Sequence, residues 1–569
     1  MRRSTLRDRL WLYGAGLLVA VAVLAPLAGP GYVLGYDMVF VPRQPLRAEL
    51  IAPGDALPRA VPLDALVSLA TQVVPGWLLQ RLLLAGILLF AAVGAGRLVP
   101  GRRRLTVLVA AVGYAWTPYL AERLLIGQWG LLLAYAALPW LVRAAIALRA
   151  GQPGALPRLV LAAVPAAVTP TGGVIAAGLT AALLLGRTRR RAAALACAAV
   201  LLLNAPWLVA ALVTSADGRS DPAGVLAFAA RGSDWSGVLG SLAGTGGIWN
   251  AETTLPSRAS LLTPIGTLVI VVLAAYGARL LHRRWPGGVA LRLAGAAAAG
   301  FLLACAPVLP GGVAALEWLV SAVPGGGLLR DGQKFLMPYA LLLAVAAALG
   351  AERLADRLDA ALQRSPAGAS DDRLAGRSVL LGALLLPVLL MPDLAYGAGG
   401  RLRPAQYPAD WDVVAARVAA DPGEVLSLPL SAYRAYDWNH GRTVLDPLPR
   451  YLDADVLVDD TLMVGEYVVS GENPRMAALR AGLAAGEPVA ATGVRWVVVQ
   501  RAYGAGVPPE QLAGLRTVHA GPDLILLSND AVPAIDGGDT FWPVTGACAL
   551  ALAVALVAIS GLRWKPTAW

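Results

Sequence analysis

Apolar segments long enough to cross a lipid bilayer recur along the whole chain. A spanning helix needs about 20 apolar residues, and a helix satisfies its backbone hydrogen bonds within itself, as the hydrocarbon core demands. The sequence therefore predicts a polytopic α-helical membrane protein. The segments lie at about residues 11–30, 77–96, 105–121, 129–148, 158–186, 192–213, 261–281, 288–308, 335–351, 378–394 and 542–562.

Clusters of arginine lie in every second gap between these segments. Loops rich in Lys and Arg stay in the cytoplasm, so the clusters predict which loops lie inside and place both termini there. Residues 158–186 fit this alternation as two short crossings or as a re-entrant hairpin, and Thr169–Gly173 interrupts them near the middle. With that segment counted twice, we expect about 12 transmembrane helices. The clusters begin at Arg2, Arg97, Arg143, Arg187, Arg279 and Arg353.

Composition excludes several classes of protein. Hydrophobic residues make up 57% of the chain and charged residues 15%, which excludes an ordinary soluble globular protein. The net charge of +11 resides mostly in the predicted cytoplasmic loops, where it indicates topology and contact with membrane lipids. The basic stretches lack interleaved aromatic residues, so we expect no nucleic-acid partner. All three cysteines lie in apolar segments, without metal-ligand spacing.

The predicted topology gives three domains, with four regions outside the plasma membrane. Residues 1–394 form a multi-helix membrane domain with outer loops 31–76, 214–260 and 309–334, and residues 542–569 form a last helix and a cytoplasmic tail. Residues 395–541 are long enough for a small extracytoplasmic domain. That region has strand-like runs at 425–430, 494–500 and 524–527 and helical composition at 475–485, which predict an α/β fold.

Two groups of ionisable residues in the outer loops are candidates for chemistry. Asp37 follows the first membrane helix directly, where a carboxylate would lie beside a lipid headgroup and act as a general base. A connecting loop with solvated charges is the alternative for this position. Glu122 and Arg123 lie between the third and fourth segments, and ionisable residues there must be solvated or paired. A local ion pair is the alternative for this second group.

Cations and aromatic residues supply further candidates. Arg330 and Lys334 precede an apolar segment on the predicted outer side, against the usual charge bias. Arg binds phosphate with two parallel hydrogen bonds and Lys as a point charge, so we expect a lipid phosphate there; neutralisation by Asp331 is the alternative. Trp249 and Asn250 could stack on and hydrogen-bond a sugar, although tryptophan near a membrane is commonly an interface residue.

These features resemble the C-type glycosyltransferase (GT-C) superfamily, whose members use polyprenyl-phosphate-linked sugars. The acid after the first membrane helix, the many-helix body and the outer domain at 395–541 make the chain similar to actinobacterial arabinofuranosyl- and mannosyltransferases. It also resembles the YfhO-like family, through RDGQKFLMPYALLLAVAAALGAERL at 330–354 and GVRWVVVQR at 493–501. The resemblance implies that Asp37 and Glu122 are the catalytic acids, with Arg330, Lys334 and Arg123 around the donor phosphate. Many members have a paired acidic motif, whereas Asp37 stands between Tyr36 and Met38. The resemblance therefore leaves a divalent cation open, and we assign no metal ligand.

The leading hypothesis is an inverting glycosyltransferase at the outer face of the plasma membrane. It would transfer a sugar from a polyprenyl-phosphate donor to a cell-envelope glycan or glycolipid. The main alternative is a non-catalytic protein that binds lipid-linked glycans or assists a true transferase. A transporter ranks last, because the apolar segments contain almost no ionisable residue.

Overall fold

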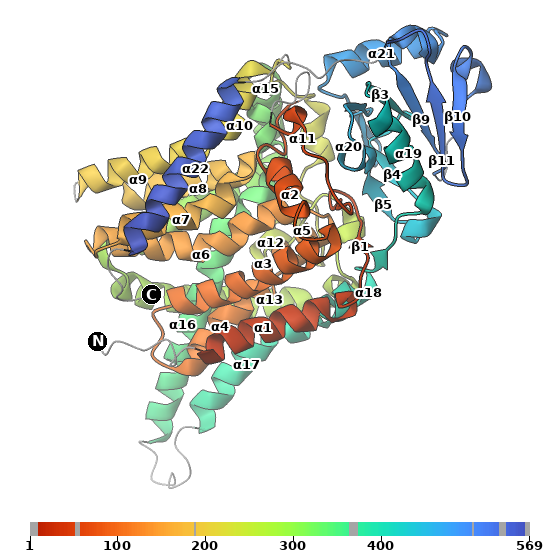
Figure 1. The fold of residues 1–569 in the computed structure, drawn as a ribbon. Coiled ribbons are helices and arrows are strands. Elements are labelled where there is room, and N and C mark those ends of the chain that lie inside the picture. Colours follow the sequence, from red (N-terminus) through yellow and green to blue (C-terminus); the bar gives the residue numbers. More distant parts are fainter. Residues whose placement is uncertain are drawn as a thin grey trace.

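The computed structural model describes residues 10–51, 57–186, 189–214, 216–363, 374–502, 506–533 and 542–563. Each predicted apolar segment contains helix, and these helices pack into one bundle (Figure 1). The predicted polytopic helical fold is confirmed. The bundle helices are α1 (Leu10–Leu24), α3 (Gly76–Leu98), α4 (Arg104–Ala115), α6 (Trp129–Arg149), α7 (Ala155–Ala167), α8 (Pro170–Leu184), α9 (Arg190–Leu203), α10 (Ala205–Val213), α13 (Leu262–Arg284), α14 (Val289–Cys305), α16 (Met337–Leu362), α17 (Leu374–Leu390) and α22 (Trp542–Arg563).

The helices differ in length, and this changes the expected number of membrane spans. Among the described residues, seven helices are long and apolar enough to cross a membrane, or nine if each of two bent pairs is one span. Helices α4, α7 and α8 have 12, 13 and 15 residues, which is short of a full span. The prediction of about 12 transmembrane helices therefore includes three helices that are too short to cross a bilayer. The predicted break in 158–186 is present, because Pro170 begins α8 and the Thr169 side chain caps it.

Glycine allows the closest helix contact in the bundle. A Cβ on Gly277 of α13 would lie 2.0 Å from the carbonyl oxygen of Ala346 in α16. One on Gly350 of α16 would lie 1.9 Å from the carbonyl oxygen of Leu273. Small residues at such a crossing let two membrane helices approach closely.

The described part of 404–528 forms a mixed five-stranded sheet with helices, in the strand order β10-β11-β9-β3-β6. Strand β3 is parallel to β6 and β9, and β11 is antiparallel to β9 and β10. The predicted α/β character is confirmed, and the Asn473 side chain caps the start of α21. The elements are β2 (Pro404–Ala405), α19 (Ala409–Ala420), β3 (Val425–Leu428), β4 (Tyr433–Ala435), β5 (Thr443–Leu445), α20 (Leu448–Tyr451), β6 (Val456–Leu457), β7 (Leu462–Val464), β8 (Tyr467–Val469), α21 (Pro474–Ala484), β9 (Trp496–Gln500), β10 (Arg516–Ala520) and β11 (Leu524–Ser528).

The chain just after α1 joins the bundle to this sheet region. Strand β1 (Tyr32–Val33) pairs with β2. The N–H of Tyr36 donates to the carbonyl of Thr443 (2.7 Å), and the N–H of Leu445 donates to the carbonyl of Tyr36 (2.8 Å). These bonds fix residues 32–37 against the β4–β5 hairpin. We call the end of the bundle that carries the sheet region the sheet end; α1 begins and α22 ends at the opposite end (Figure 1).

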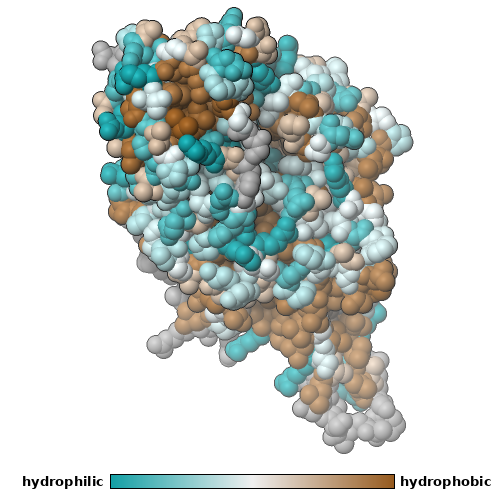
Figure 2. Space-filling view, turned by 90° about the vertical axis from the view of Figure 1, so that its right-hand side faces the viewer, coloured by the Kyte–Doolittle hydropathy of each residue, from teal (hydrophilic) through white to brown (hydrophobic). Residues whose placement is uncertain are grey.

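The polarity of the surface changes between the sheet end and the opposite end of the bundle. In Figure 2, hydrophilic residues cover most of the upper part of the molecule, which also bears one hydrophobic patch, and hydrophobic residues cover much of the helical part below. On α13, the side chains of Leu262, Ile265 and Leu268 are each more than half exposed. Such a face is stable only where lipid covers it.

Short elements at the sheet end connect the bundle helices and carry most of the candidate residues. These are η3 (Ala48–Leu50), α2 (Leu63–Thr71), α5 (Pro118–Leu125), α11 (Ala223–Ala227), α12 (Gly237–Ala243), η4 (Ala251–Thr253), α15 (Gly312–Ala322), η8 (Gly326–Leu329), η9 (Gly332–Leu336) and α18 (Ala395–Gly400).

Candidate functional site

Glu122 is a buried acceptor that ties three segments together. Thr117 caps α5 and Pro118 occupies its first turn, which fixes the start of the helix. The Glu122 carboxylate accepts hydrogen bonds from the backbone N–H groups of Gly247 (3.2 Å) and Ile248 (3.1 Å) and from Nε2 of Gln333 (3.1 Å). Burial raises the pKa of Glu122 to about 7, against the opposing effect of Arg258, Arg123 and the two N–H groups.

Arg123 links α5 to the 330–334 segment. Its guanidinium is fully buried and donates to both carboxylate oxygens of Asp331, at 2.7 and 2.9 Å. A further N–H donates to Oε1 of Gln128 (2.7 Å). Two of the predicted candidate groups are therefore in contact, and most of the Arg123 donors are committed to protein acceptors.

Asp37 is held by one residue from each part of the molecule. The Tyr433 hydroxyl of β4 donates to Oδ1 of Asp37 (2.6 Å), and Nε2 of Gln128 donates to Oδ2 (3.2 Å). The preceding residue, Tyr36, has a φ of 46°, which turns the chain so that it bonds the hairpin. Asp37 is half-buried, and Gln128 connects it to Arg123.

Arg330 and Lys334 share their acids with other cations. Lys334 Nζ lies 3.6 Å from Asp331, which also binds Arg123. Arg330 lies 3.1 Å from Glu472, which also binds Arg59. Burial pushes the pKa of Glu472 upward, but Arg59 and Arg330 outweigh it and hold that pKa below its usual value. Asp331 and Glu472 each neutralise only one of their two cations, so a net positive charge remains beside each carboxylate.

Asp37 and the two cations Arg330 and Lys334 belong to one network of polar side chains. Polar contacts connect Asp37 to Gln128, Gln128 to Arg123 and Arg123 to Asp331, which also lies 3.6 Å from Lys334. Arg330 directly precedes Asp331 in the chain. The structure thus brings together Asp37, Arg330 and Lys334, which are far apart in sequence. A carboxylate that can take a proton lies beside cations that can hold an anion.

The sugar-binding candidates Trp249 and Asn250 are neighbours in the chain but differ in their surroundings. The Arg330 guanidinium lies 4.9 Å from the ring centre of Phe228, and Trp249 packs edge-on against Phe228 at 4.9 Å. Among the described residues, the buried Nε1 of Trp249 has no hydrogen-bond acceptor. Asn250 accepts from the N–H of Glu252 (3.0 Å) and caps η4. The geometry gives Asn250 a structural role, and its contact with a sugar stays a prediction.

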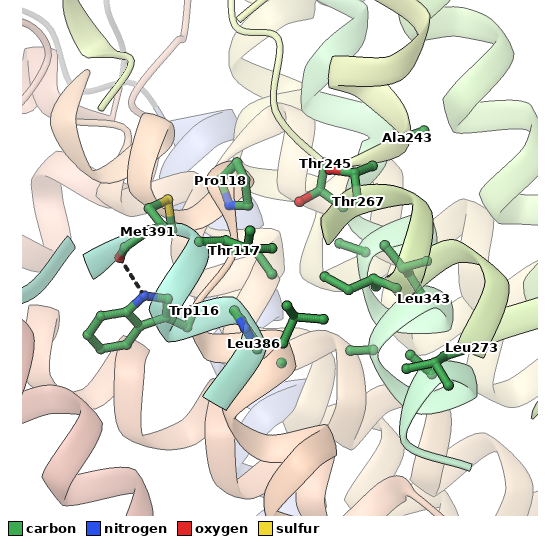
Figure 3. A pocket seen from close by; sticks show the side chains of 18 of the residues that line it. Trp116, Thr117, Pro118, Ala243, Thr245, Thr267, Leu273, Leu343, Leu386 and Met391 are labelled. Carbon is green, nitrogen blue, oxygen red and sulfur yellow. Dashed lines mark hydrogen bonds between the residues drawn. The ribbon is translucent and has the colours of Figure 1, made fainter. Parts of the chain in front are cut away.

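An apolar cavity of about 70 Å³ lies in the bundle below the start of α5 (Figure 3). Trp116 beside it donates from Nε1 to the carbonyl of Met391 (2.9 Å). Within the described residues, the buried Thr245 hydroxyl and Arg258 Nε have no hydrogen-bond partner. The lining is polar at Thr117, Thr245, Arg258 and Thr267 and otherwise mostly apolar, including Leu273, Ala340, Leu343, Ala344, Leu386 and Leu390.

Sequence reasoning missed four residues of this cluster: Arg59, Gln128, Tyr433 and Glu472. Tyr433 and Glu472 belong to the sheet region; Tyr433 is 396 residues from Asp37, and Glu472 is 142 residues from Arg330. The one available signal was that Tyr433 follows the carboxyl end of β3, where parallel strands commonly place functional residues. In the described part of the chain, no three His, Cys, Asp or Glu side chains are grouped to hold a metal ion.

No family model and no curated protein matches the chain. Solved structures do match: the cryo-EM structure of the arabinofuranosyltransferase AftD from Mycobacteria has a TM-score of 0.56 at 18% identity, over 95% of this chain and 40% of that one. A mutant of AftD gives a TM-score of 0.54 at 19% identity, over 93% of this chain and 42% of the other. The chain thus spans about two fifths of the AftD chains it matches. The expected similarity to arabinofuranosyltransferases is confirmed in the architecture, and over nearly its whole length this multi-pass membrane protein shares the fold of AftD.

Proposed function

We propose that this protein is a membrane glycosyltransferase that transfers a sugar from a polyprenyl-phosphate donor to a cell-envelope glycan or glycolipid. The observation that supports the proposal is the polar network at the sheet end that links Asp37, through Gln128, Arg123 and Asp331, to Lys334, with Arg330 next to Asp331 in the chain. The AftD-like fold supports arabinofuranose as the sugar to test first. The sheet end would face the outside, because arginine-rich loops lie at the opposite end.

The reaction we assign to this arrangement is a single displacement. Asp37 takes the proton of an acceptor hydroxyl as its oxygen attacks the anomeric carbon. The bond from that carbon to the phosphate oxygen breaks, and its electron pair leaves with the lipid phosphate. Arg330 and Lys334 stabilise the charge that develops on the phosphate. Attack from the face opposite the leaving group inverts the anomeric centre.

The cavity below α5 is a suitable place for the first part of the lipid chain. Its apolar walls match a polyprenyl chain, while Thr245 and Arg258 offer unsatisfied donors at the end nearest Glu122. Glu122 itself is engaged by three donors and ties the 244–250 loop to η9. We therefore assign Glu122 a positioning role in place of the acid–base role that the resemblance implied.

The residues present do not fit a divalent cation in their described arrangement. Such an ion prefers several carboxylate oxygens, but Asp331 and Glu472 are bound to arginines. Asp37 alone would remain as a carboxylate ligand, so the proposed reaction uses no metal ion.

The test is transfer from decaprenyl-phosphate sugars, with arabinofuranose first, by the purified full-length protein. Asp37→Asn should abolish transfer and leave expression and membrane insertion intact, with a small fall in melting temperature because the amide keeps one of the two acceptor oxygens. Glu49→Gln, an exposed acid in the same loop, should transfer like the wild type. Normal turnover by Asp37→Asn would disprove the assignment of the base.

A non-catalytic binding protein is the second candidate. Both Asp37 oxygens already accept hydrogen bonds from the protein, which is the observation in its favour. In that case the wild type and Asp37→Asn would bind decaprenyl phosphate equally and neither would turn over any donor.

A further inference from the structure

Three arginines meet at one place on the sheet end, away from Asp37. Arg403 Nε donates to the carbonyl of Gly400 (2.8 Å), and Arg442 Nη2 donates to the same carbonyl (3.4 Å). Arg401 donates to the carbonyls of Thr254 (2.9 Å) and Glu252. Backbone carbonyls therefore hold the three guanidinium groups in place without neutralising them.

The positive charge of this cluster is uncompensated. Elsewhere in this half of the molecule, arginines such as Arg434 and Arg495 are paired with aspartates. In the part of the chain that the structure describes, none of Arg401, Arg403 and Arg442 has a carboxylate within ion-pair distance. Burial, then the charges of Arg403 and Arg401, lower the pKa of Arg442 to about 10. Like charges this close disfavour one another, and a bound anion would offset their repulsion.

The cluster lies beside the sheet-end terminus of the first bundle helix. Element α18 runs through left-handed conformations from Tyr396 to Gly399, which are unfavourable for the non-glycine residues. A Cβ on Gly397 would lie 3.4 Å from Pro26, just past α1. The Tyr396 side chain is 69% exposed, as tyrosines at a membrane–water interface commonly are. Arg401 and Arg403 thus directly follow a segment packed against the end of the first bundle helix, and Arg442 reaches the same segment through its hydrogen bond to Gly400.

We propose that Arg401, Arg403 and Arg442 bind the phosphate of an anionic phospholipid in the leaflet at the sheet end. Guanidinium groups bind phosphate oxygens with paired hydrogen bonds, and basic clusters beside membrane helices attract anionic headgroups. The site is separate from the one around Asp37. Tyr433, which bonds Asp37, pairs with Leu445 at one end of the hairpin, and Arg442 precedes Thr443 at the other. Three residues of strand separate these ends by about 10 Å.

The experiment measures enrichment of phosphatidylglycerol around the full-length protein, by native mass spectrometry from nanodiscs of phosphatidylglycerol and phosphatidylcholine. The wild type is compared with Arg403→Gln and with Arg403→Gln/Arg442→Gln. Arg516→Gln is the matched control, because it removes an exposed arginine of the sheet region that is paired with Asp530. Each arginine lost from the site should weaken phosphatidylglycerol binding about fivefold.

Retained enrichment in Arg516→Gln, with loss in the double variant, supports the site. Equal enrichment in the wild type and Arg403→Gln overturns it; that single variant is informative even if the double variant misfolds, because Arg403 is exposed. Release of phosphatidylglycerol from the wild type by millimolar inorganic phosphate would show a site for free phosphate, and overturns the lipid assignment. None of these readouts depends on glycosyl transfer.

Discussion

At the scale of single residues, Asp37 depends on neighbours that sequence could not connect to it. Its place after the first membrane helix was readable from the pattern, as were the cations Arg330 and Lys334. Its hydrogen bond from Tyr433 was not, because 396 residues separate the two. Long-range pairing of this kind leaves no periodicity in a single sequence.

Tyr433→Phe removes one hydrogen bond to Asp37 and little else. A hydrogen bond to a charged group is worth about 1.5–3 kcal/mol, so we expect kcat to fall about 10- to 100-fold while KM for the donor stays the same. Steady-state transfer assays measure both constants. Tyr396→Phe, at an exposed tyrosine, is the control. A change in KM alone would contradict a positioning role.

Glu122 makes stability depend on pH in a direction unusual for a carboxylate. Its pKa rises from 4.5 to about 7 on folding, so the folded protein holds an extra proton between these values. Stability from this group is therefore present at low pH and is lost as pH rises from about 4.5 to about 7.

Glu122→Gln should flatten that dependence. Thermal unfolding in detergent at several pH values from 4.5 to 8 measures it. The variant should also be less stable overall, because an amide offers one acceptor oxygen where the carboxylate offers two. An unchanged slope would mean that Glu122 stays ionised throughout.

At the scale of elements, helix existence was predictable and helix extent was not. Hydropathy located the bundle helices but not the apolar helix α15, which lies in the predicted outer loop 309–334. The interruption at Thr169–Gly173 correctly marked the break before α8. The shortness of α4, α7 and α8 depends on packing, since neighbouring helices rather than lipid cover much of their surface. The glycines of the α13–α16 crossing were equally invisible, because glycine is common throughout this chain.

Gly350→Ala tests the α13–α16 contact. The added methyl would lie 1.9 Å from a backbone carbonyl of α13, so the helices must move apart, at a cost of about 1–3 kcal/mol. Because α16 continues η9, which carries Lys334, transfer should fall as well. Gly295→Ala in α14 meets nothing within 4 Å and should be neutral or slightly stabilising. Equal melting temperatures for the two variants would disprove the tight crossing.

At the scale of the whole molecule, Glu472 joins regions that are distant in the chain. It binds Arg59 and Arg330 and accepts from the Ser220 hydroxyl (2.5 Å). The sheet region is therefore attached to the bundle by charge as well as by strand pairing. Composition predicted that residues 395–541 would fold separately, and it gave no sign of this attachment.

Glu472→Gln leaves two arginines without their acid and should lower stability by about 2 kcal/mol. Adding Arg330→Gln removes one orphaned charge, so the double variant should melt at a higher temperature than Glu472→Gln alone. Thermal unfolding of the full-length protein measures both, with the exposed Glu466→Gln as control. A double variant that is less stable than either single one would contradict this account.

The bond between Asp37 and Tyr433 also bears on how the protein is made. A ribosome finishes residue 37 long before residue 433, and the membrane helices between them are inserted in the meantime. The carboxylate therefore acquires its final setting only after the sheet region has been synthesised and has folded back onto the first loop. Partly synthesised chains would lack a competent site, so any transfer activity is expected to begin only with the nearly finished protein.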